Sequence, residues 1–385
     1  MYLLPKPKTI KEQDGQMLLC HSTHIVMTKE VAETEMHAAK RLQEAIRQET
    51  GLILPFSVGE VREGDLSLGI AKTLPEQTYE ITIDEKGGQI SGGDGAGVLY
   101  GVETFCQIVQ QCGGILPCVQ IQDAPDMPNR GYYFDQTRGR VLKLEELKKI
   151  ADRMCRYKLN QLQLYVEHTY LFRDFSEMWR DQTPLTAEEI RELDSYCRER
   201  HIELVPSLAS FGHLCTLLST KTYGDLCEME DSWKEPFSFW NRMRYHTINV
   251  SDERSLPLIK KMIAEYMQLF SSNKFNICAD ETFCLGKYKS KKLAEERGVH
   301  RLYIDYVKEL AQFLVENGKI PMFWGDIIWN SPELMKELPE SMICLNWGYA
   351  PEQREDETRA IAQTGAVQYL CPGVCGWNQW ANLIE

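Results

Sequence analysis

The stretch LEELKKIADRMCRYKLNQLQLYVEH, residues 144–168, carries the pattern that decides the fold. Its first half spaces apolar residues three and four apart, so Leu144–Tyr157 is predicted to be an amphipathic helix. Its second half, Gln161–Glu167, is typical of a strand that is buried on both faces. A helix that leads directly into such a strand is the repeating unit of a parallel sheet.

The same unit recurs along the rest of the chain. The helix predicted over Thr186–Arg200 opens with a capping box, Thr186-Ala-Glu-Glu189. Further strands are predicted at Gly131–Asp135, Leu204–Ala209, Phe275–Asp280, Pro321–Ile327, Met342–Trp347 and Val367–Cys371. This many units favours a (β/α)8 barrel of the TIM type over an open sheet. Only seven strands can be read, because Leu214–Lys274 adds none and the eighth strand is missing from the pattern.

A small α/β domain is predicted before the barrel, over residues 1–125, with the barrel over 126–385. Between them, Asp123–Asn129 is rich in turn-forming residues. Within the small domain, the glycine-rich turn Ser91–Gly101 precedes an apolar helix. The turn lacks a clean GxGxxG spacing and an acidic ribose ligand, so we expect a packing turn rather than a phosphate site.

The composition excludes several classes of function. With 43% hydrophobic residues and 26% charged residues, the chain is globular rather than disordered. Because the net charge is -13 and no basic run is present, nucleic acid is not expected as a partner. No apolar run approaches the roughly 20 residues of a membrane span, and the N-terminus lacks the features of a signal peptide, so a cytoplasmic location is expected.

The 13 cysteines are scattered and are predicted to be buried free thiols. The closest pair, Cys371 and Cys375, lacks the second pair that a zinc site needs. No metal and no cofactor are therefore expected. A homo-oligomer stays open as a possible partner arrangement.

Polar residues at strand ends are the functional candidates, because a barrel of this type builds its active site at the C-terminal ends of its strands. These strand ends offer Asp135 with Arg138, Glu167 with His168, Ser210–His213, Asp280 with Glu281, Asp326, Asn346 with Trp347, and Tyr369. Carboxylates and tryptophans dominate this set. Tryptophan stacks on pyranose rings and carboxylates move protons at the glycosidic oxygen, so the set indicates sugar chemistry.

The adjacent carboxylates Asp280 and Glu281 follow a buried strand. Neighbours on a regular strand point to opposite faces, so both can reach one site only where the strand ends and the chain turns. A solvated acidic loop is the alternative, but the other acidic strand ends favour a functional pair.

Several motifs in this order resemble glycoside hydrolase family 20, the β-N-acetylhexosaminidases. The pair Asp280-Glu281 is similar to the family's catalytic pair, and Arg130-Gly-Tyr-Tyr-Phe-Asp135 with Arg138 resembles the opening of its barrel. Other matches are Tyr157-Lys-Leu-Asn160, Phe211-Gly-His213 and the helix motif in Gly95–Phe105. The matches extend from about residue 90 to 380.

The resemblance implies an exo-acting enzyme that releases terminal β-linked GlcNAc or GalNAc with retention, through an oxazolinium ion made by the substrate's own acetamido group. Glu281 would be the general acid and base, and Asp280 would hold the acetamido N–H. Glycan or oligosaccharide would then be the partner. The resemblance implies substrate contacts for Arg130 (on the 3- and 4-hydroxyls), Tyr369 (on the acetamido oxygen) and the aromatic residues Trp324, Trp347 and Trp377. As polar residues at strand ends, Glu167, His213 and Asp326 are further binding candidates.

The sequence also departs from the family pattern. The second strand ends in Tyr165-Val-Glu-His168 instead of an acidic pair, Cys371 stands where an aspartate is common, and the final strand with its tryptophan is not found. Two alternatives therefore stay open. One is a catalytically weak or inactive N-acetylhexosamine-binding barrel, and the other is a barrel enzyme that uses its two carboxylates conventionally on other sugars.

Overall fold

The computed structural model describes residues 1–236, 238–350 and 354–374. These residues form two compact units. The first comprises Met1–Tyr132, Leu144–Leu162 and Ser195–Glu203, and the second comprises the other described residues.

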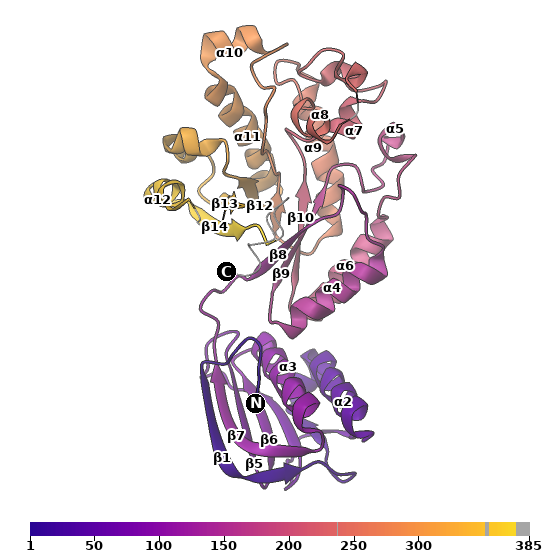
Figure 1. Ribbon diagram of the computed structural model, residues 1–385, viewed down its shortest axis with the longest axis vertical. Coiled ribbons are helices and arrows are strands. Elements are labelled where there is room, and N and C mark those ends of the chain that lie inside the picture. Colours follow the sequence, from indigo (N-terminus) through magenta and orange to yellow (C-terminus); the bar gives the residue numbers. More distant parts are fainter. Residues whose placement is uncertain (237, 351–353, 375–385) are drawn as a thin grey trace. The chain divides into compact units, whose positions relative to one another are not determined.

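A mixed seven-stranded sheet forms the centre of the first unit, in the order β1-β7-β5-β6-β4-β2-β3. The strands are β1 (Thr9–Leu18), β2 (Ile25–Met27), β3 (Phe56–Val58), β4 (Leu66–Ile70), β5 (Tyr79–Asp84), β6 (Gly87–Gly92) and β7 (Ile115–Asp123). Helices α2 (Met36–Thr50) and α3 (Gly95–Cys112) pack side by side on one face of this sheet, and α1 (Lys29–Thr34) precedes them (Figure 1). The alternating burial of β5 fits a strand with one face on this core.

The glycine-rich turn before α3 is closely packed, as the sequence predicted. Asp94 caps the helix by accepting the Gly97 N–H at 2.7 Å. A Cβ at Gly97 would lie 2.2 Å from the Thr78 carbonyl oxygen, and one at Gly92 would lie 2.1 Å from the Val98 nitrogen. Glycine is therefore needed here because backbone segments approach each other closely.

The second sheet holds the predicted barrel strands in chain order, β14-β13-β12-β11-β10-β9-β8. Its pairs from β10 to β14 are parallel. The strands are β8 (Gly131–Asp135), β9 (Gln161–Val166), β10 (Glu203–Leu208), β11 (Lys274–Asn276), β12 (Ile320–Trp324), β13 (Ile343–Gly348) and β14 (Val367–Pro372). Within the described residues this is a partial parallel barrel whose edge strands are β8 and β14.

The helices predicted from periodicity form with small shifts at their ends. Helix α4 spans Leu144–Arg156 and α6 spans Ala187–Arg198. The capping box is made in both directions, because Thr186 Oγ1 accepts the Glu189 N–H at 3.2 Å and Glu189 accepts the Thr186 N–H at 2.9 Å. The other helices after β9 are α5 (Ser176–Trp179), α7 (Cys215–Leu218), α8 (Phe239–Arg244), α9 (Ser255–Tyr266), α10 (Lys291–Arg297), α11 (Val299–Glu316) and α12 (Glu355–Gln363).

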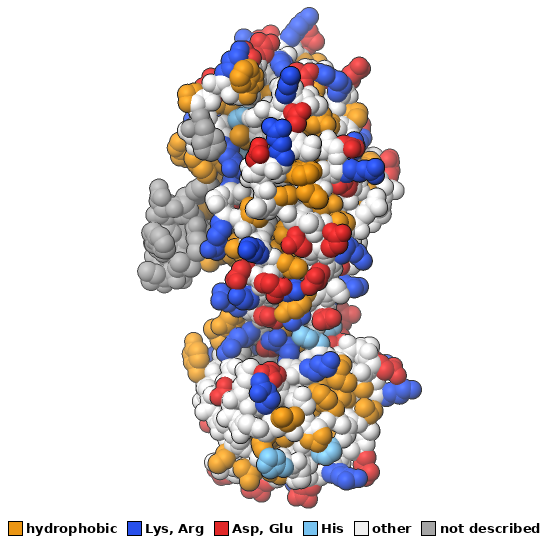
Figure 2. All heavy atoms as spheres, turned by 90° about the vertical axis from the view of Figure 1, so that its right-hand side faces the viewer, with side chains coloured by type: hydrophobic (Ala, Val, Ile, Leu, Met, Phe, Trp, Pro, Cys, Tyr) orange, Lys and Arg blue, Asp and Glu red, His pale blue; other side chains and the backbone are white. Residues whose placement is uncertain are grey.

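The long segment between β10 and β11 adds no strand in its described part, as expected. It contributes α7, α8, α9 and single turns of 3₁₀ helix instead. None of the described helices combines the length and the apolar character that crossing a membrane requires. The described cysteines are free thiols and most are buried. Figure 2 shows acidic and basic side chains interspersed over the face that it presents.

Candidate active site

The strand that precedes Asp280 and Glu281 is shorter than predicted. We expected a strand over Phe275–Asp280, but β11 ends at Asn276. Cys278, Ala279 and Glu281 have φ angles of 58°, 63° and 50°, in the left-handed region that non-glycine residues rarely adopt. Such residues cost about 1–3 kcal/mol each and occur at functional sites. The turn they make breaks the alternation of a strand, which lets both carboxylates face one site.

A glycine after β10 allows a second loop to approach this turn. A Cβ at Gly212 would lie 2.5 Å from the Asp280 carbonyl oxygen and 3.3 Å from that of Glu281. The next residue, His213, also has a positive φ of 59°. The Phe211-Gly-His213 motif is thus explained by close backbone contact with the acidic turn.

The imidazole of His213 joins the two carboxylates. Its Nε2 lies 3.3 Å from Asp280 Oδ2 and 3.2 Å from Glu281 Oε2. Burial opposes protonation of His213, but Asp280 and Glu281 outweigh it and raise its pKa to about 10. Burial would likewise raise the pKa of Asp280, but His213 and then Arg138 lower it below its ordinary value. At neutral pH the site therefore holds an imidazolium between two acidic side chains.

The same three residues could in principle hold a metal ion, because one ligand atom from each lies within 4.8 Å of the others. A ligating histidine must be neutral, however, and the raised pKa of His213 favours its protonated form. In this protonated form, the contacts of His213 with Asp280 and Glu281 are ion pairs.

Asp326 supports the acidic turn from the next strand. It follows β12, and its Oδ2 accepts the backbone N–H of Glu281 at 3.0 Å. Burial and the nearby carboxylates of Asp280 and Glu281 raise the pKa of Asp326 to about 8. Asp326 is consequently a neutral acid below that pH, which spares the site a third negative charge.

Arg138 lies after β8, on the loop that also holds its partner Asp135. Its Nε donates to Asp135 Oδ2 at 2.6 Å, and its guanidinium lies 4.8 Å from the ring centroid of Tyr165. Burial works against its charge, but Tyr165 and Asp135 outweigh it and raise its pKa above the usual value. Arg138 also lowers the pKa of Asp280, so it belongs electrostatically to the acidic cluster.

Glu167 is buried directly after β9 and is fully engaged by neighbouring side chains. Its Oε1 accepts the Tyr165 hydroxyl at 2.9 Å, and its Oε2 accepts Arg242 Nη2 from α8 at 3.0 Å. Its negative charge also helps to raise the pKa of His213. Glu167 therefore acts on the site through its neighbours, and its predicted contact with substrate stays a prediction.

The predicted aromatic residues occupy different places. Trp324 ends β12, is 7% exposed and packs edge-on against Tyr133, with ring centroids 4.9 Å apart. Trp347 lies in β13, between the rings of Trp329 and Tyr349. Tyr369 is half-buried in β14 opposite Leu345, and its predicted contact is untested. Trp377 lies outside the described residues.

Arg130 is not placed with this cluster. It precedes β8, at the N-terminal end of the strand, whereas the acidic residues follow the C-terminal ends. Its guanidinium donates to the carbonyl oxygens of Lys158, Met127 and Pro128 and to the Tyr100 hydroxyl. These hydrogen bonds of Arg130 hold the segment that precedes β8 in place. The predicted grip of Arg130 on sugar hydroxyls stays a prediction, whereas Arg138 is the arginine that lowers the pKa of Asp280.

Several buried polar atoms at the strand ends have no hydrogen-bond partner among the described residues. They include Asp280 Oδ1, Asp326 Oδ1 and the indole Nε1 of Trp347. Buried polar atoms are nearly always paired in native proteins, so the two carboxyl oxygens left over at the acidic turn, Asp280 Oδ1 and Asp326 Oδ1, point to a polar ligand. The C-terminal strand ends of a barrel are where such a ligand is expected.

Comparison with known families agrees with this geometry. The catalytic domain of glycosyl hydrolase family 20 matches residues 128–375, and domain 2 of the same family matches residues 1–124. The chain belongs to glycoside hydrolase family 20. The partial parallel barrel is thus part of the TIM-type barrel of this family, and the predicted resemblance is confirmed.

Curated family 20 relatives are distant and longer. A β-hexosaminidase of Porphyromonas gingivalis is 24% identical, with 97% of this chain and 50% of that protein aligned. One of Vibrio furnissii is 26% identical over 72% of this chain and 48% of that protein. The chain thus spans about half the length of these relatives.

Solved family 20 structures share the fold. An exo β-N-acetylglucosaminidase of Vibrio harveyi in complex with N-acetylglucosamine has a TM-score of 0.79 and 19% identity, covering 96% of this chain and 60% of that one. A chitobiase of Flavobacterium johnsoniae has a TM-score of 0.80 and 20% identity, covering 96% and 59%.

One arginine of the site, Arg242, was not predicted at all, and Arg138 was named only as a strand-end candidate without a substrate contact. Arg138 carried a signal, since it lies three residues after Asp135 in the motif that opens the family 20 barrel. Arg242 carried none, because it lies on a short helix in the segment that adds no strand. Its contact with Glu167 joins residues 75 positions apart, which no local pattern predicts.

Proposed function

We propose that this protein is an exo-acting β-N-acetylhexosaminidase that hydrolyses terminal β-linked GlcNAc or GalNAc with retention of configuration. The observation that carries the proposal is the shared contact of Asp280 and Glu281 with His213 at the end of β11. Membership of family 20 adds to it.

The spacing of the two carboxylates supports retention. One oxygen of Asp280 and one of Glu281 lie within 4.8 Å of each other. Inverting glycosidases separate their carboxyl groups by roughly 6.5–9.5 Å to admit a water, so this pair is too close for that mechanism. Family 20 enzymes instead use the substrate's acetamido group as the nucleophile.

The electrostatics suit different roles for the two acids. Asp280 has a lowered pKa, so it is an anion that accepts the acetamido N–H and balances the positive charge of the oxazolinium ion. Glu281 is partly exposed, with 24% of its side chain accessible, so it can reach the glycosidic oxygen. It donates a proton to the leaving group as the acetamido oxygen bonds to the anomeric carbon, and then takes a proton from the water that opens the ring.

The surrounding residues hold these two in place. The backbone of Glu281 is fixed by Asp326, and both carboxylates face His213. Trp347 has a buried indole N–H without a partner among the described residues, and it is a candidate donor to the sugar. Arg138 is a candidate for the sugar hydroxyls, as well as Arg130.

The test is release of nitrophenol from a nitrophenyl β-GlcNAc glycoside. Glu281→Gln removes the general acid and base, so kcat should fall by about 10²–10⁴-fold. Asp280→Asn keeps the shape but loses the charge, and kcat should fall by about 10²–10³-fold. Unchanged turnover in Glu281→Gln would contradict the proposal, and binding without turnover in the unmodified chain would indicate a sugar-binding protein instead.

A further inference from the structure

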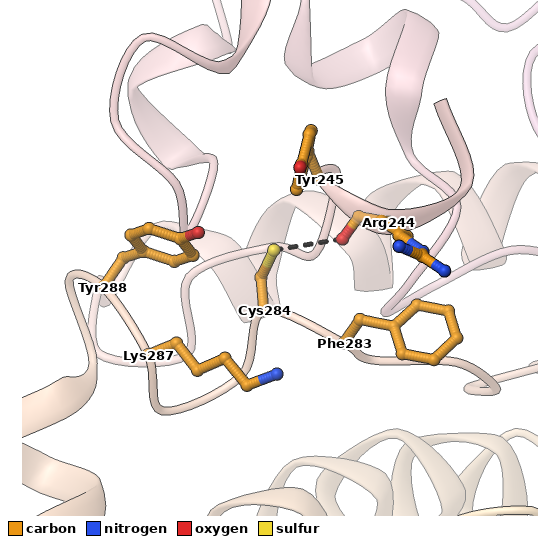
Figure 3. Close-up of a pocket in the computed structure, with 6 residues that line it drawn as sticks. All are labelled: Arg244, Tyr245, Phe283, Cys284, Lys287 and Tyr288. Atoms are coloured by element: carbon orange, nitrogen blue, oxygen red, sulfur yellow. Dashed lines mark hydrogen bonds between the residues drawn. The ribbon is translucent and has the colours of Figure 1, made fainter. Parts of the chain in front are cut away.

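A pocket of about 280 Å³ lies beside the acidic turn and takes no part in the mechanism above. It is lined by Arg244, Tyr245, Phe283, Cys284, Lys287 and Tyr288 (Figure 3). Its residues come from the end of α8 and from the loop that follows Glu281.

The pocket is adjacent to the proposed general acid. Phe283 is two residues after Glu281, and its N–H donates to the Glu281 carbonyl oxygen at 2.7 Å. Cys284 then ties the loop to α8, because its thiol lies 3.0 Å from the Arg244 carbonyl oxygen. Two residues span at most about 7 Å, so a sugar next to the scissile bond is within reach of the pocket wall.

The pocket wall carries positive charge. Its titratable side chains include two exposed cations, Arg244 and Lys287, and neither has a carboxylate within ion-pair distance in the part of the chain that the structure describes. Arg244 lies 5.2 Å from the exposed ring of Trp240. In a protein with a net charge of -13, two cations left unpaired beside an acidic turn form a local site for an anion.

Aromatic rings complete the pocket. Phe283 and Tyr288 are each 43% exposed. Figure 3 shows the Arg244 guanidinium and the Phe283 ring on one side of Cys284, with Tyr288 on the other. Exposed rings offer stacking faces for a pyranose, and a guanidinium pairs with a carboxylate in two-point geometry.

We propose that this pocket binds the sugar to which the terminal N-acetylhexosamine is attached, and that it selects an acidic sugar, a uronate. Arg244 and Lys287 hold the carboxylate, and Phe283 or Tyr288 stacks on the ring. This inference rests on the proposed function and adds the chemical class of the leaving group.

The experiment compares two disaccharides that differ in a single group, GlcNAcβ(1→4)glucuronate and GlcNAcβ(1→4)glucose, with the full chain. The ratio of their kcat/KM values is measured for the unmodified protein, Arg244→Gln, Lys287→Gln and the double variant. Lys292→Gln, which removes a charge outside the pocket, is the matched control. Binding of both disaccharides to Glu281→Gln is measured by calorimetry, so the inference is tested even without turnover.

We expect the acidic disaccharide to be preferred, each single variant to lower the preference about two- to fivefold, and 1 M salt to weaken it. Lys292→Gln should keep the preference. Equal kcat/KM values together with equal binding would overturn the inference, as would an equal loss in Lys292→Gln. The nitrophenyl glycoside has no second sugar and therefore tests the proposed function alone. If it is hydrolysed while the two disaccharides show no difference, the pocket's role is rejected and the proposed function stands. Preferential binding of the acidic disaccharide without turnover would support the pocket's role and reject the proposed function.

Discussion

Single side chains set the charge of the acidic site. His213 is 2% exposed and has two carboxylates within 3.3 Å of its Nε2. Removing one partner of a buried ion pair leaves the other partners uncompensated, which costs more than the pair itself contributes. The stability of the barrel and the pKa of its reactive groups are therefore linked through this one imidazole.

The first prediction at this scale is a pH-dependent loss of stability in His213→Gln. The pKa of His213 is raised from 6.5 to about 10 on folding, so its stabilising contribution is complete below about pH 6.5 and is lost as the pH rises through 10. Near pH 6 the substitution should cost about 3 kcal/mol or more, and near pH 10 much less. Thermal unfolding at both pH values measures this difference. His300→Gln, at an exposed histidine, is the control, and a loss independent of pH would be evidence against the charged cluster.

Asp326 gives a second prediction, on activity. Its pKa of about 8 means that a third anion forms beside Asp280 and Glu281 in alkaline solution, so kcat/KM for the nitrophenyl glycoside should fall above pH 8. Asp326→Asn keeps an acceptor for the Glu281 N–H and should remove this decline. Asp326→Ala leaves that N–H unpaired, at a cost of about 1–3 kcal/mol, and should lower kcat about tenfold or more. An alkaline decline that persists in Asp326→Asn would assign it to another group.

At the scale of elements, the site depends on how closely two loops approach. Gly212→Ala places a methyl group 2.5 Å from the Asp280 carbonyl oxygen, so the acidic turn must move. Overpacking of this kind costs about 1–3 kcal/mol, and displaced carboxylates should lower kcat by more than tenfold. Gly114→Ala is the matched control, because its Cβ would meet no atom closer than 3.6 Å. Equal turnover in both variants would show that the approach of these loops does not matter.

The elements also show what could be predicted from sequence. Strand β8 and the capping box of α6 were predicted correctly, because period and capping are local properties. The end of β11 was not predicted correctly, because the apolar residues continue past Asn276 although the backbone there already adopts positive φ angles. That turn is held by contacts with Gly212 and Asp326, which lie far away in the sequence.

At the scale of the whole molecule, the barrel class and the acidic pair followed from strand and helix repetition with carboxylates at strand ends. The sequence did not show which of Arg130 and Arg138 lies at the acidic site. Both belong to one motif, and only the fold decides which end of β8 each occupies. The pocket beside the acidic turn was likewise hidden. Arg244 and Lys287 belong to separate segments that meet at the contact of Cys284 with α8.

The measurement that tests the central claim most directly compares two nitrophenyl substrates on the unmodified chain, the β-GlcNAc glycoside and the β-glucoside. In the proposed mechanism the acetamido group supplies an intramolecular nucleophile, and Asp280 orients it. We therefore predict that kcat/KM is higher for the GlcNAc substrate by at least about a thousandfold. Equal rates on the two substrates would contradict substrate-assisted catalysis at the Asp280-Glu281 pair.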